Sequence, residues 1–328
     1  MQRPRLTWLA FGVAALAACS DSQAPTEVPQ ATAFKLPTGR QPSNPQALPV
    51  VHTANIAVES PTYDFTIDLR FNTPVTDAQR EVFVNAAHRW EEIIVSEVPD
   101  IVGTIPAGLC LTGLPNFTGT IDDLLIDVVL QPIDGPGAIL GAAGPCFVRN
   151  ADNLPVHGVM FFDTADLAFL EGLGLFDEVI VHEMGHVLGF GTLWNFRRAL
   201  RTGTGGPNPL FVGPLAQEFY NPAPDFHPLP VPVENTGGGG TRDGHWRESV
   251  FRNELMTGFL NLGENPLSLV TTASMSDLGY GVFVYAAEQW CPPWWATQLM
   301  ASLEAGGGDQ GVNLDGAEVL VSPIAVIQ

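Results

Sequence analysis

Basic side chains are scarce in this chain of 328 residues. Lys35 is the single lysine, and 14 lysines and arginines stand against 35 aspartates and glutamates, which gives a formal net charge of −21. Because nucleic-acid backbones are neutralised by clusters of Lys and Arg, this balance excludes sequence-independent nucleic-acid binding. It also argues against a peripheral domain that is held on anionic lipid by its charge alone.

Long apolar runs are scarce as well. The longest is Leu6–Ala18, which follows two arginines, Arg3 and Arg5. It is short for a bilayer span and is typical of a secretory signal. Its end, Leu16-Ala17-Ala18-Cys19, resembles the lipobox of bacterial lipoproteins, with an ordinary signal peptide as the alternative. The resemblance implies cleavage after residue 18 and a lipid on Cys19. Because Ser20 follows, it also implies a membrane anchor at the outer membrane or cell surface of a Gram-negative bacterium.

Cysteine is sparse, because only Cys110, Cys146 and Cys291 follow Cys19. Export favours a disulfide, and the odd number leaves one cysteine over. We expect the pair Cys110–Cys146, since both flank loop-like Gly/Pro sequence within one subdomain, but the spacing alone does not determine the connectivity.

The folded part begins at about residue 60 and has the pattern of a mixed α and β domain. Alternation from Tyr63 to Phe71 predicts a strand with one buried face. A capping box at Thr76-Asp77-Ala78-Gln79 opens a predicted helix to about Val98, whose apolar stripe would pack on a sheet. Three further segments have the pattern of regular elements, namely strands at Leu124–Leu130 and Val159–Phe162 and a helix at Asp177–Leu188.

The helix at Asp177–Leu188 carries the sequence His182-Glu183-Met184-Gly185-His186. Residues four apart lie on one helix face, so both imidazoles can bind one zinc ion. Glu183 is rotated by about 100° from His182, so it can act as a general base on a water molecule without being a ligand. The motif predicts a zinc hydrolase. Two structural histidines are the alternative, and we interpret His88 and His157 in that way.

The residues after the motif indicate which class of zinc hydrolase the chain resembles. Gly189 extends it to His-Glu-x-x-His-x-x-Gly, where glycine can take the left-handed conformation that ends the helix. Compact metzincins have a third histidine three residues later, where this chain has Thr192, a poor zinc ligand. Residues 192–244 instead have the composition of an insertion rich in loops. The candidates for the third ligand are His227, which prolines flank, His245, which follows a glycine-rich run, and Glu254.

The motif, the long insertion, His245 and the segment Asn253–Gly258 around Met256 together resemble the leishmanolysin-type metzincins. The resemblance covers roughly residues 63–280. It implies an α+β, metzincin-like zinc protease with a mixed twisted sheet, a backing helix, an active-site helix and a loop-rich C-terminal subdomain. It implies zinc on His182, His186 and His245, with Glu183 as the base. It also implies that Met256 forms a turn beneath the metal, followed by a helix at Leu267–Leu278.

These observations divide the chain into four predicted segments. They are a lipoprotein signal peptide at 1–18, a flexible tether at 19–59, a catalytic domain at 60–287 and an extension of unknown role at 288–328; a short propeptide is the alternative for the tether. Within the catalytic domain we expect an N-terminal subdomain to about 191, an insertion at 192–244 and a C-terminal subdomain from 245. In the extension, Asp309 and Asp315 offer oxygen ligands, so calcium is a second cofactor hypothesis.

The predicted function is that of a tethered zinc endopeptidase that hydrolyses peptide bonds in proteins or peptides. The alternative is a zinc-containing surface lipoprotein for binding or adhesion, with little catalysis. Glu183 favours the enzyme, because a scaffold that only binds has no chemical need for a base beside the metal.

Overall fold

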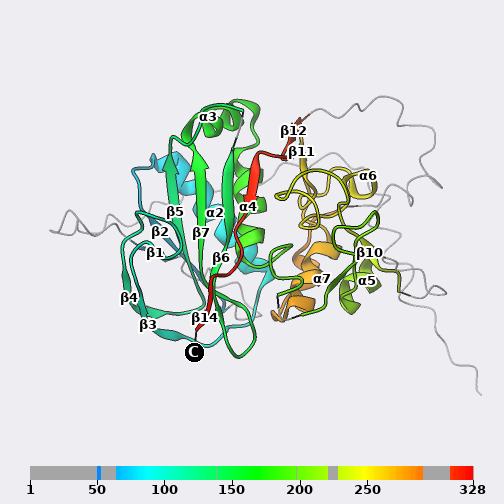
Figure 1. Cartoon of the computed structure of the whole chain (residues 1–328), viewed down its shortest axis with the longest axis horizontal. Coiled ribbons are helices and arrows are strands. Elements are labelled where there is room, and N and C mark those ends of the chain that lie inside the picture. The colour runs from blue at the N-terminus through cyan, green and yellow to red at the C-terminus, as the bar shows by residue number, and fades with distance from the viewer. Residues whose placement is uncertain are drawn as a thin grey trace, which may run out of the picture.

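The computed structural model describes residues 50–52, 64–137, 139–196, 198–220, 228–290 and 311–327. The predicted signal peptide and nearly all of the tether lie outside the described residues, as do Cys19, His227, Cys291 and Asp309. The described part is a mixed α and β structure in which a seven-stranded sheet with helices lies beside a second lobe of short elements (Figure 1). In the described ranges, every helix is too short or too polar to cross a membrane.

The large sheet has the strand order β1-β2-β5-β7-β6-β13, with β14 also paired to β6. Its centre is formed by the parallel strands β2 (Ile67–Phe71), β5 (Leu124–Gln131) and β7 (Pro155–Asp163). The next strand, β6 (Gly141–Arg149), runs antiparallel to β7. The sheet is therefore mixed, as the sequence predicts.

The two edges of the sheet come from opposite ends of the chain. At one edge β1 (Val50–His52) pairs antiparallel with β2. At the other, β13 (Glu318–Leu320) and β14 (Ala325–Ile327) pair parallel with β6. The strands at 318–320 and 325–327, within the predicted C-terminal extension, therefore belong to the same sheet as β2, β5 and β7.

The sequence prediction that β2 has only one buried face is wrong, because all five of its residues are buried. Of the polar side chains that looked like a solvent face, Arg70 belongs to a buried network. Arg70 Nη2 donates to Asp127 Oδ2 at 2.7 Å, and His157 Nε2 lies 2.8 Å from the same carboxylate oxygen. Although burial opposes ionisation, the bonds from Arg70 and His157 lower the pKa of Asp127. His157 has a structural partner here.

Helix α2 (Asp77–Ile93) begins with the predicted capping box: Thr76 Oγ1 accepts from Gln79 N, and Gln79 Oε1 accepts from Thr76 N, both at 3.1 Å. It ends at Ile93 and not at Val98, because Ile94 is extended and pairs with Val282. His88, on this helix, is bonded to Glu91. The helix packs against β2 and against α4 (Phe176–Val187), so it backs the helix that carries the His-Glu motif.

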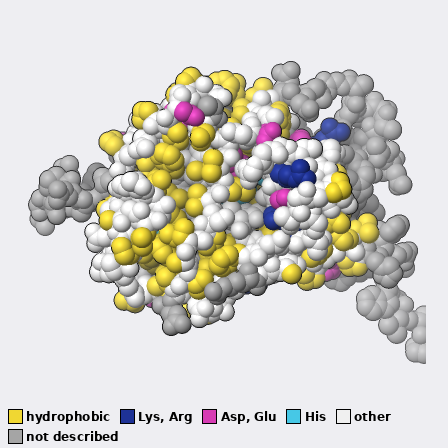
Figure 2. Space-filling model, in the orientation of Figure 1, with side chains coloured by type: hydrophobic (Ala, Val, Ile, Leu, Met, Phe, Trp, Pro, Cys, Tyr) yellow, Lys and Arg dark blue, Asp and Glu magenta, His cyan; other side chains and the backbone are white. Residues whose placement is uncertain are grey.

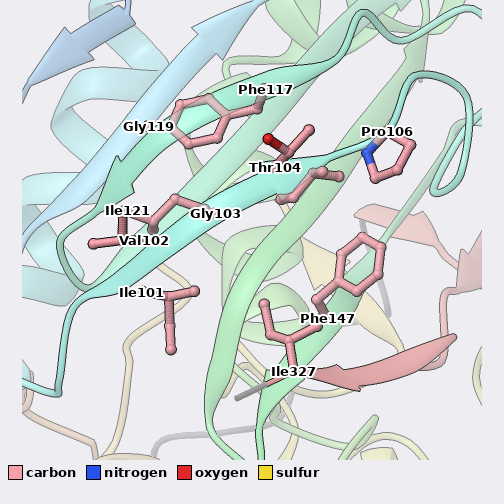
Figure 3. Close-up of a pocket in the computed structure, with 11 residues that line it drawn as sticks. Ile101, Val102, Gly103, Thr104, Pro106, Phe117, Gly119, Ile121, Phe147 and Ile327 are labelled. Carbon is pink, nitrogen blue, oxygen red and sulfur yellow. The ribbon is translucent and has the colours of Figure 1, made fainter.

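The other face of the sheet is covered by a hairpin of β3 (Ile101–Ile105) and β4 (Phe117–Ile121), over a smaller apolar core. Cys110 and Cys146 form a disulfide with a Cα–Cα distance of 5.6 Å, which ties the hairpin loop to β6. An apolar hollow of about 320 Å³ lies between the hairpin, Phe147 and Ile327 (Figure 3). Figure 2 shows hydrophobic side chains gathered on this half of the face in view.

The second lobe contains more regular structure than the sequence predicts for an insertion. It holds the small sheet of β8 (Arg201–Thr202), β9 (Leu210–Phe211) and β10 (Val231–Pro232) and the helix α5 (Pro214–Tyr220). The remaining elements, in chain order, are α6 (Glu248–Phe251), β11 (Phe259–Asn261), α7 (Leu269–Leu278), the 3-10 helix η1 (Val284–Ala286) and β12 (Gly311–Asn313). Before the insertion, α3 (Thr164–Leu173) links β7 to α4.

Aromatic side chains join this lobe to the end of α4. Trp246 lies 5.0 Å from Phe190, 5.1 Å from Trp194 and 5.4 Å from Phe251, measured between ring centroids. All four rings are fully buried and belong to the same apolar core as the helices on the sheet. Burial of such large side chains holds the lobe firmly against α4.

Candidate metal centre

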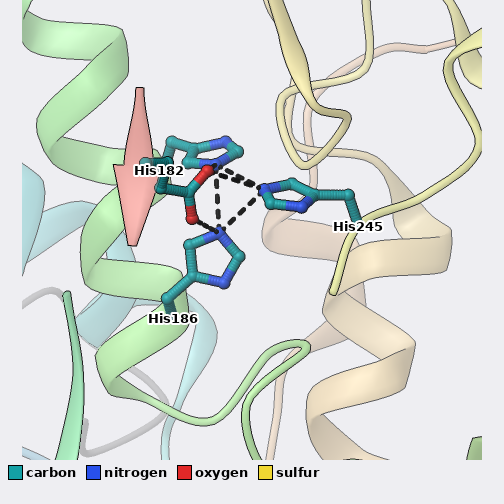
Figure 4. A group of neighbouring side chains, drawn as sticks. His182, His186 and His245 are labelled. Atoms are coloured by element: carbon teal, nitrogen blue, oxygen red, sulfur yellow. Dashed lines mark hydrogen bonds and ion pairs between the residues drawn. The ribbon is translucent and has the colours of Figure 1, made fainter. Parts of the chain in front are cut away.

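Three imidazole rings meet at the junction of the two lobes. His182 and His186 extend from the same face of α4, and His245 approaches from the second lobe (Figure 4). The three Nε2 atoms lie 3.0 Å from one another in every pairing, and all three side chains are fully buried. The helical spacing of four residues therefore brings the first two together, and the path of the second lobe adds the third.

The opposite nitrogen of each ring faces a backbone carbonyl. His182 Nδ1 lies 2.7 Å from Leu255 O, His186 Nδ1 lies 2.9 Å from Phe190 O, and His245 Nδ1 lies 2.9 Å from Thr241 O. A carbonyl oxygen can only accept a hydrogen bond, so each Nδ1 must carry the proton. In a neutral ring this leaves the Nε2 lone pair free, and all three lone pairs are directed at one point.

This donor set fits a zinc ion. Four-coordinate zinc with bonds of about 2.0–2.1 Å places its nitrogen ligands about 3.3–3.4 Å apart, close to the spacing of the three nitrogen atoms. Burial lowers the pKa of His186 to about 4, so its ring is neutral at pH 7, as a metal ligand requires. Three lone pairs that converge on one point repel one another, and a cation bound at that point removes the repulsion.

The position of His245 depends on its neighbour Trp246. The Trp246 backbone N–H donates to Met256 O at 2.9 Å, and its indole Nε1–H donates to Thr271 Oγ1 at 2.8 Å. The His245 carbonyl accepts from Glu234 N at 2.9 Å. These bonds and the aromatic cluster around Trp246 fix the backbone at His245, so the insertion of some fifty residues returns to α4 with a defined geometry.

Met256 lies beneath the helix that carries two of the histidines. A Cβ atom at Gly185 would lie 2.9 Å from Met256 Cε and 2.9 Å from Trp90 Cζ2, so the absence of a side chain at Gly185 lets both neighbours approach α4. The helix ends just beyond: Gly189 has φ +110°, in the region that favours glycine. Met256 therefore packs on the helix that carries His182 and His186, and Gly189 follows the end of that helix.

Glu254 is not grouped with the three histidines. It is fully buried, and its carboxylate accepts from Met256 N at 2.6 Å, from Ser268 N at 3.0 Å and from Ser268 Oγ at 2.8 Å, and it also accepts from Thr271 Oγ1. Burial raises the pKa of Glu254 even though these bonds oppose the shift. The residue thus ties the Met256 turn to the start of α7 and is not a candidate ligand.

Glu183 follows His182 on α4 and is fully buried. Within the described residues, neither carboxylate oxygen has a hydrogen-bond partner. Burial, followed by the nearby charge of Glu318, raises its pKa well above the usual range. A carboxylate whose oxygens are free and whose affinity for protons is increased is suited to accept a proton from a reacting molecule.

Glu318, on β13, is the member of the site that sequence reasoning missed. Its carboxylate oxygens lie 3.0 Å from His186 Nε2, 3.1 Å from His245 Nε2 and 3.6 Å from His182 Nε2. The three histidines and Glu318 form one buried group able to hold a metal ion. No motif marks Glu318; the one signal is an acidic side chain inside the apolar run 317–321.

The calcium hypothesis gains no support from the described residues. Asp315 Oδ1 accepts a hydrogen bond from the backbone N–H of Gly238, and Asp315 is in none of the clusters of acidic or metal-ligating side chains in the described part of the chain. The exposed acidic cluster in that part of the chain consists of Glu97, Asp100 and Asp122 and does not include Asp315.

A mixed sheet backed by a helix pair, with a His-Glu-x-x-His helix and a buried group of side chains that could hold a metal ion, is the arrangement expected of a metallopeptidase. A family model described as Leishmanolysin matches residues 100–303, and the chain belongs to this family of metallopeptidases. The match confirms the resemblance seen in the sequence. A search of curated proteins and a search of solved structures each found no match.

Proposed function

We propose that this chain is a zinc-dependent endopeptidase that hydrolyses peptide bonds in proteins or peptides. His182, His186 and His245 would hold the zinc ion. The observation that carries the proposal is the convergence of their three Nε2 atoms, each 3.0 Å from the other two, with every Nδ1 engaged by a backbone carbonyl. A zinc ion in such a site supplies Lewis-acid chemistry, which polarises a peptide carbonyl and makes water more acidic.

In this proposal Glu183 handles the proton. Its buried carboxylate takes a proton from the attacking water and passes it to the nitrogen of the leaving amine. The site excludes bulk water, since Glu183 and the three histidines are fully buried, and a charge in such surroundings acts more strongly than it does in water. Met256 and Glu254 do not take part in the chemistry. They stabilise the turn whose Leu255 carbonyl accepts the hydrogen bond from His182 Nδ1.

Glu183→Gln tests the proposal most simply, because the amide keeps the shape of the side chain but cannot take the proton. Glu178→Gln is the matched control, on the same helix but outside the site. Each variant is made with Glu318 intact and with Glu318→Gln, because the Glu318 carboxylate faces the same nitrogen atoms.

All variants should keep a full zinc content. Glu183→Gln should reduce the cleavage of a labelled casein by about 10²–10⁴-fold, and Glu178→Gln should not reduce it. Cleavage within about threefold of the parent in Glu183→Gln would show that Glu183 is not the base. Full zinc without any cleavage in either background would favour the alternative of a zinc-containing binding protein.

We also propose that Cys19 is the lipid-bearing N-terminus of the mature protein and anchors it at the outer membrane or cell surface. The support is the lipobox-like sequence after an apolar run. Stable anchoring requires more than one acyl chain, so the mass of the intact protein from cells should show cleavage before Cys19 and several chains added. An unmodified Cys19, or an N-terminus elsewhere, would contradict this proposal.

A further inference from the structure

The last described segment, residues 311–327, crosses the metal centre from one lobe to the other. It begins as β12, which pairs antiparallel with β11 of the second lobe, and it continues as β13 and β14 along β6 of the large sheet. Figure 1 shows this segment between the two lobes. Glu318, the first residue of β13, is 2% exposed.

The segment occupies the free edge of β6. Val321 N donates to Ala143 O at 2.8 Å, Ile324 N donates to Cys146 O at 2.9 Å, and Asn150 N donates to Ile327 O at 2.9 Å. Without the segment, β6 would be an exposed edge strand beside the metal centre. Such an edge is where an extended peptide can add as a further strand through main-chain hydrogen bonds.

The second lobe encloses the segment from the opposite side. A Cβ at Gly240 would lie 1.9 Å from the carbonyl oxygen of Glu318, and one at Gly244 would lie 2.4 Å from Leu320 Cδ1. Leu320 and Ser322 also line a cavity of about 470 Å³ with Arg201 and Arg242. Residues 318–322 therefore fill part of the space between the sheet and the loop that leads to His245.

At the metal centre the segment presents a carboxylate and not a peptide carbonyl. The Glu318 oxygens lie 3.0–3.6 Å from the three Nε2 atoms, so the carboxylate stands where a fourth ligand would stand. Structural zinc sites have four protein ligands, whereas catalytic sites keep one position open for water or substrate. Three histidines with Glu318 form a closed set, and Glu318 offers no bond for the site to cut.

We propose that residues 311–327 form a built-in inhibitory strand. Glu318 blocks the fourth position on the metal, and the strand covers the edge of β6 on which an extended peptide substrate would lie. The protein in this conformation is latent, and displacement or removal of the strand opens both the metal and the edge. This inference rests on the proposed peptidase function.

The test uses the full chain with Glu318→Ala, with the nearly isosteric Glu318→Gln and with Val319→Thr as the control. Val319 lies on the same strand, but its side chain is 44% exposed. Three properties are measured: cleavage of labelled casein per bound zinc, the affinity for a peptide hydroxamate probe, and the visible absorption spectrum of the Co²⁺-substituted protein. The rate of zinc loss to a chelator is measured in parallel, and circular dichroism checks the fold.

The expected result for both Glu318 variants is at least a tenfold rise in cleavage and in hydroxamate affinity, with a changed cobalt spectrum. Glu318→Ala should also lose zinc at least tenfold faster, because it has one ligand fewer. Val319→Thr should match the parent in every property. The inhibitory strand would be overturned if both Glu318 variants kept the hydroxamate affinity, the cobalt spectrum and the rate of zinc loss of the parent. This holds whether or not their cleavage of casein changes. Tighter hydroxamate binding with a changed spectrum but no cleavage would support the strand and contradict the peptidase function.

Discussion

Replacement of Gly185 by alanine reverses the usual effect of this substitution in a helix. Alanine in a helix interior is normally more stable than glycine by about 0.5–1 kcal/mol, because glycine loses more backbone freedom on folding. At Gly185, however, the new Cβ would lie 2.9 Å from Met256 Cε and 2.9 Å from Trp90 Cζ2. Overpacking of this kind costs about 1–3 kcal/mol.

The Trp90 ring has little room to yield, since its Nε1–H donates to Val181 O at 2.9 Å and the ring is fully buried. We therefore expect Gly185→Ala to lower the free energy of unfolding by about 0.5–2 kcal/mol, measured by urea denaturation of the zinc-loaded protein. The new Cβ should also displace the turn around Met256. The variant should then release zinc faster, because Leu255, next to Met256, accepts the hydrogen bond from His182 Nδ1.

Gly172 is the matched control. It also lies in a helix, α3, but a Cβ there would meet nothing within 4 Å. Gly172→Ala should therefore raise the free energy of unfolding by up to about 1 kcal/mol and leave zinc release unchanged. A gain in stability for Gly185→Ala equal to that of Gly172→Ala would refute the view that Trp90 and Met256 pack against α4 through Gly185.

Three more predictions concern Glu254 beside the site and two features elsewhere in the fold. Glu254→Gln places an amide N–H₂ group among four donors, so it should lower the free energy of unfolding by about 1–3 kcal/mol in urea denaturation, and an unchanged value would contradict the role of Glu254 in the turn. Asp163 accepts four backbone N–H bonds, chiefly from Ala165, which lower its pKa to about 2, against about 3.9 in the unfolded chain. The extra stability of the parent over Asp163→Asn should therefore be complete above about pH 5 and be lost progressively as the pH falls towards about 1, and a difference that does not change with pH would contradict it. Replacing both Cys110 and Cys146 by serine should cost about 4 kcal/mol of unfolding free energy, as chain entropy gives for residues 36 apart, without loss of zinc.

The parts of the structure that local sequence determines were the ones that could be predicted. The capping box at Thr76 and the His-Glu motif on α4 depend on residues three or four apart, and α4 ends shortly before Gly189, whose positive φ favours glycine. His245 and Met256 lie far from α4 in the chain. Local sequence left His245 as one of three candidate ligands, and only the resemblance to a known family favoured it and pointed to Met256.

The parts that could not be predicted depend on contacts between distant segments. The alternating pattern of β2 gave no sign that both of its faces are buried, because that depends on where the hairpin β3–β4 lies: the Arg70 guanidinium lies 5.6 Å from the centre of the Phe117 ring. Glu318 is 132 residues beyond His186 and carries no motif, so its place among the histidines follows only from the pairing of β13 with β6. A buried acid in an apolar run is the pattern to look for in such tails.

The most direct test of the central claim is the zinc content of histidine variants at equal free zinc. The parent and the variants His182→Ala, His186→Ala, His245→Ala and His157→Ala are equilibrated in a zinc buffer and analysed by atomic mass spectrometry. His227→Ala is added, since the sequence left His227 open as a ligand. The account predicts one zinc ion per chain in the parent, in His157→Ala and in His227→Ala, and less than about a tenth in the other three variants, since each lost ligand weakens binding by more than the 10–100-fold typical of an outer-shell partner. A full zinc ion in His245→Ala, or zinc lost from His227→Ala, would contradict it.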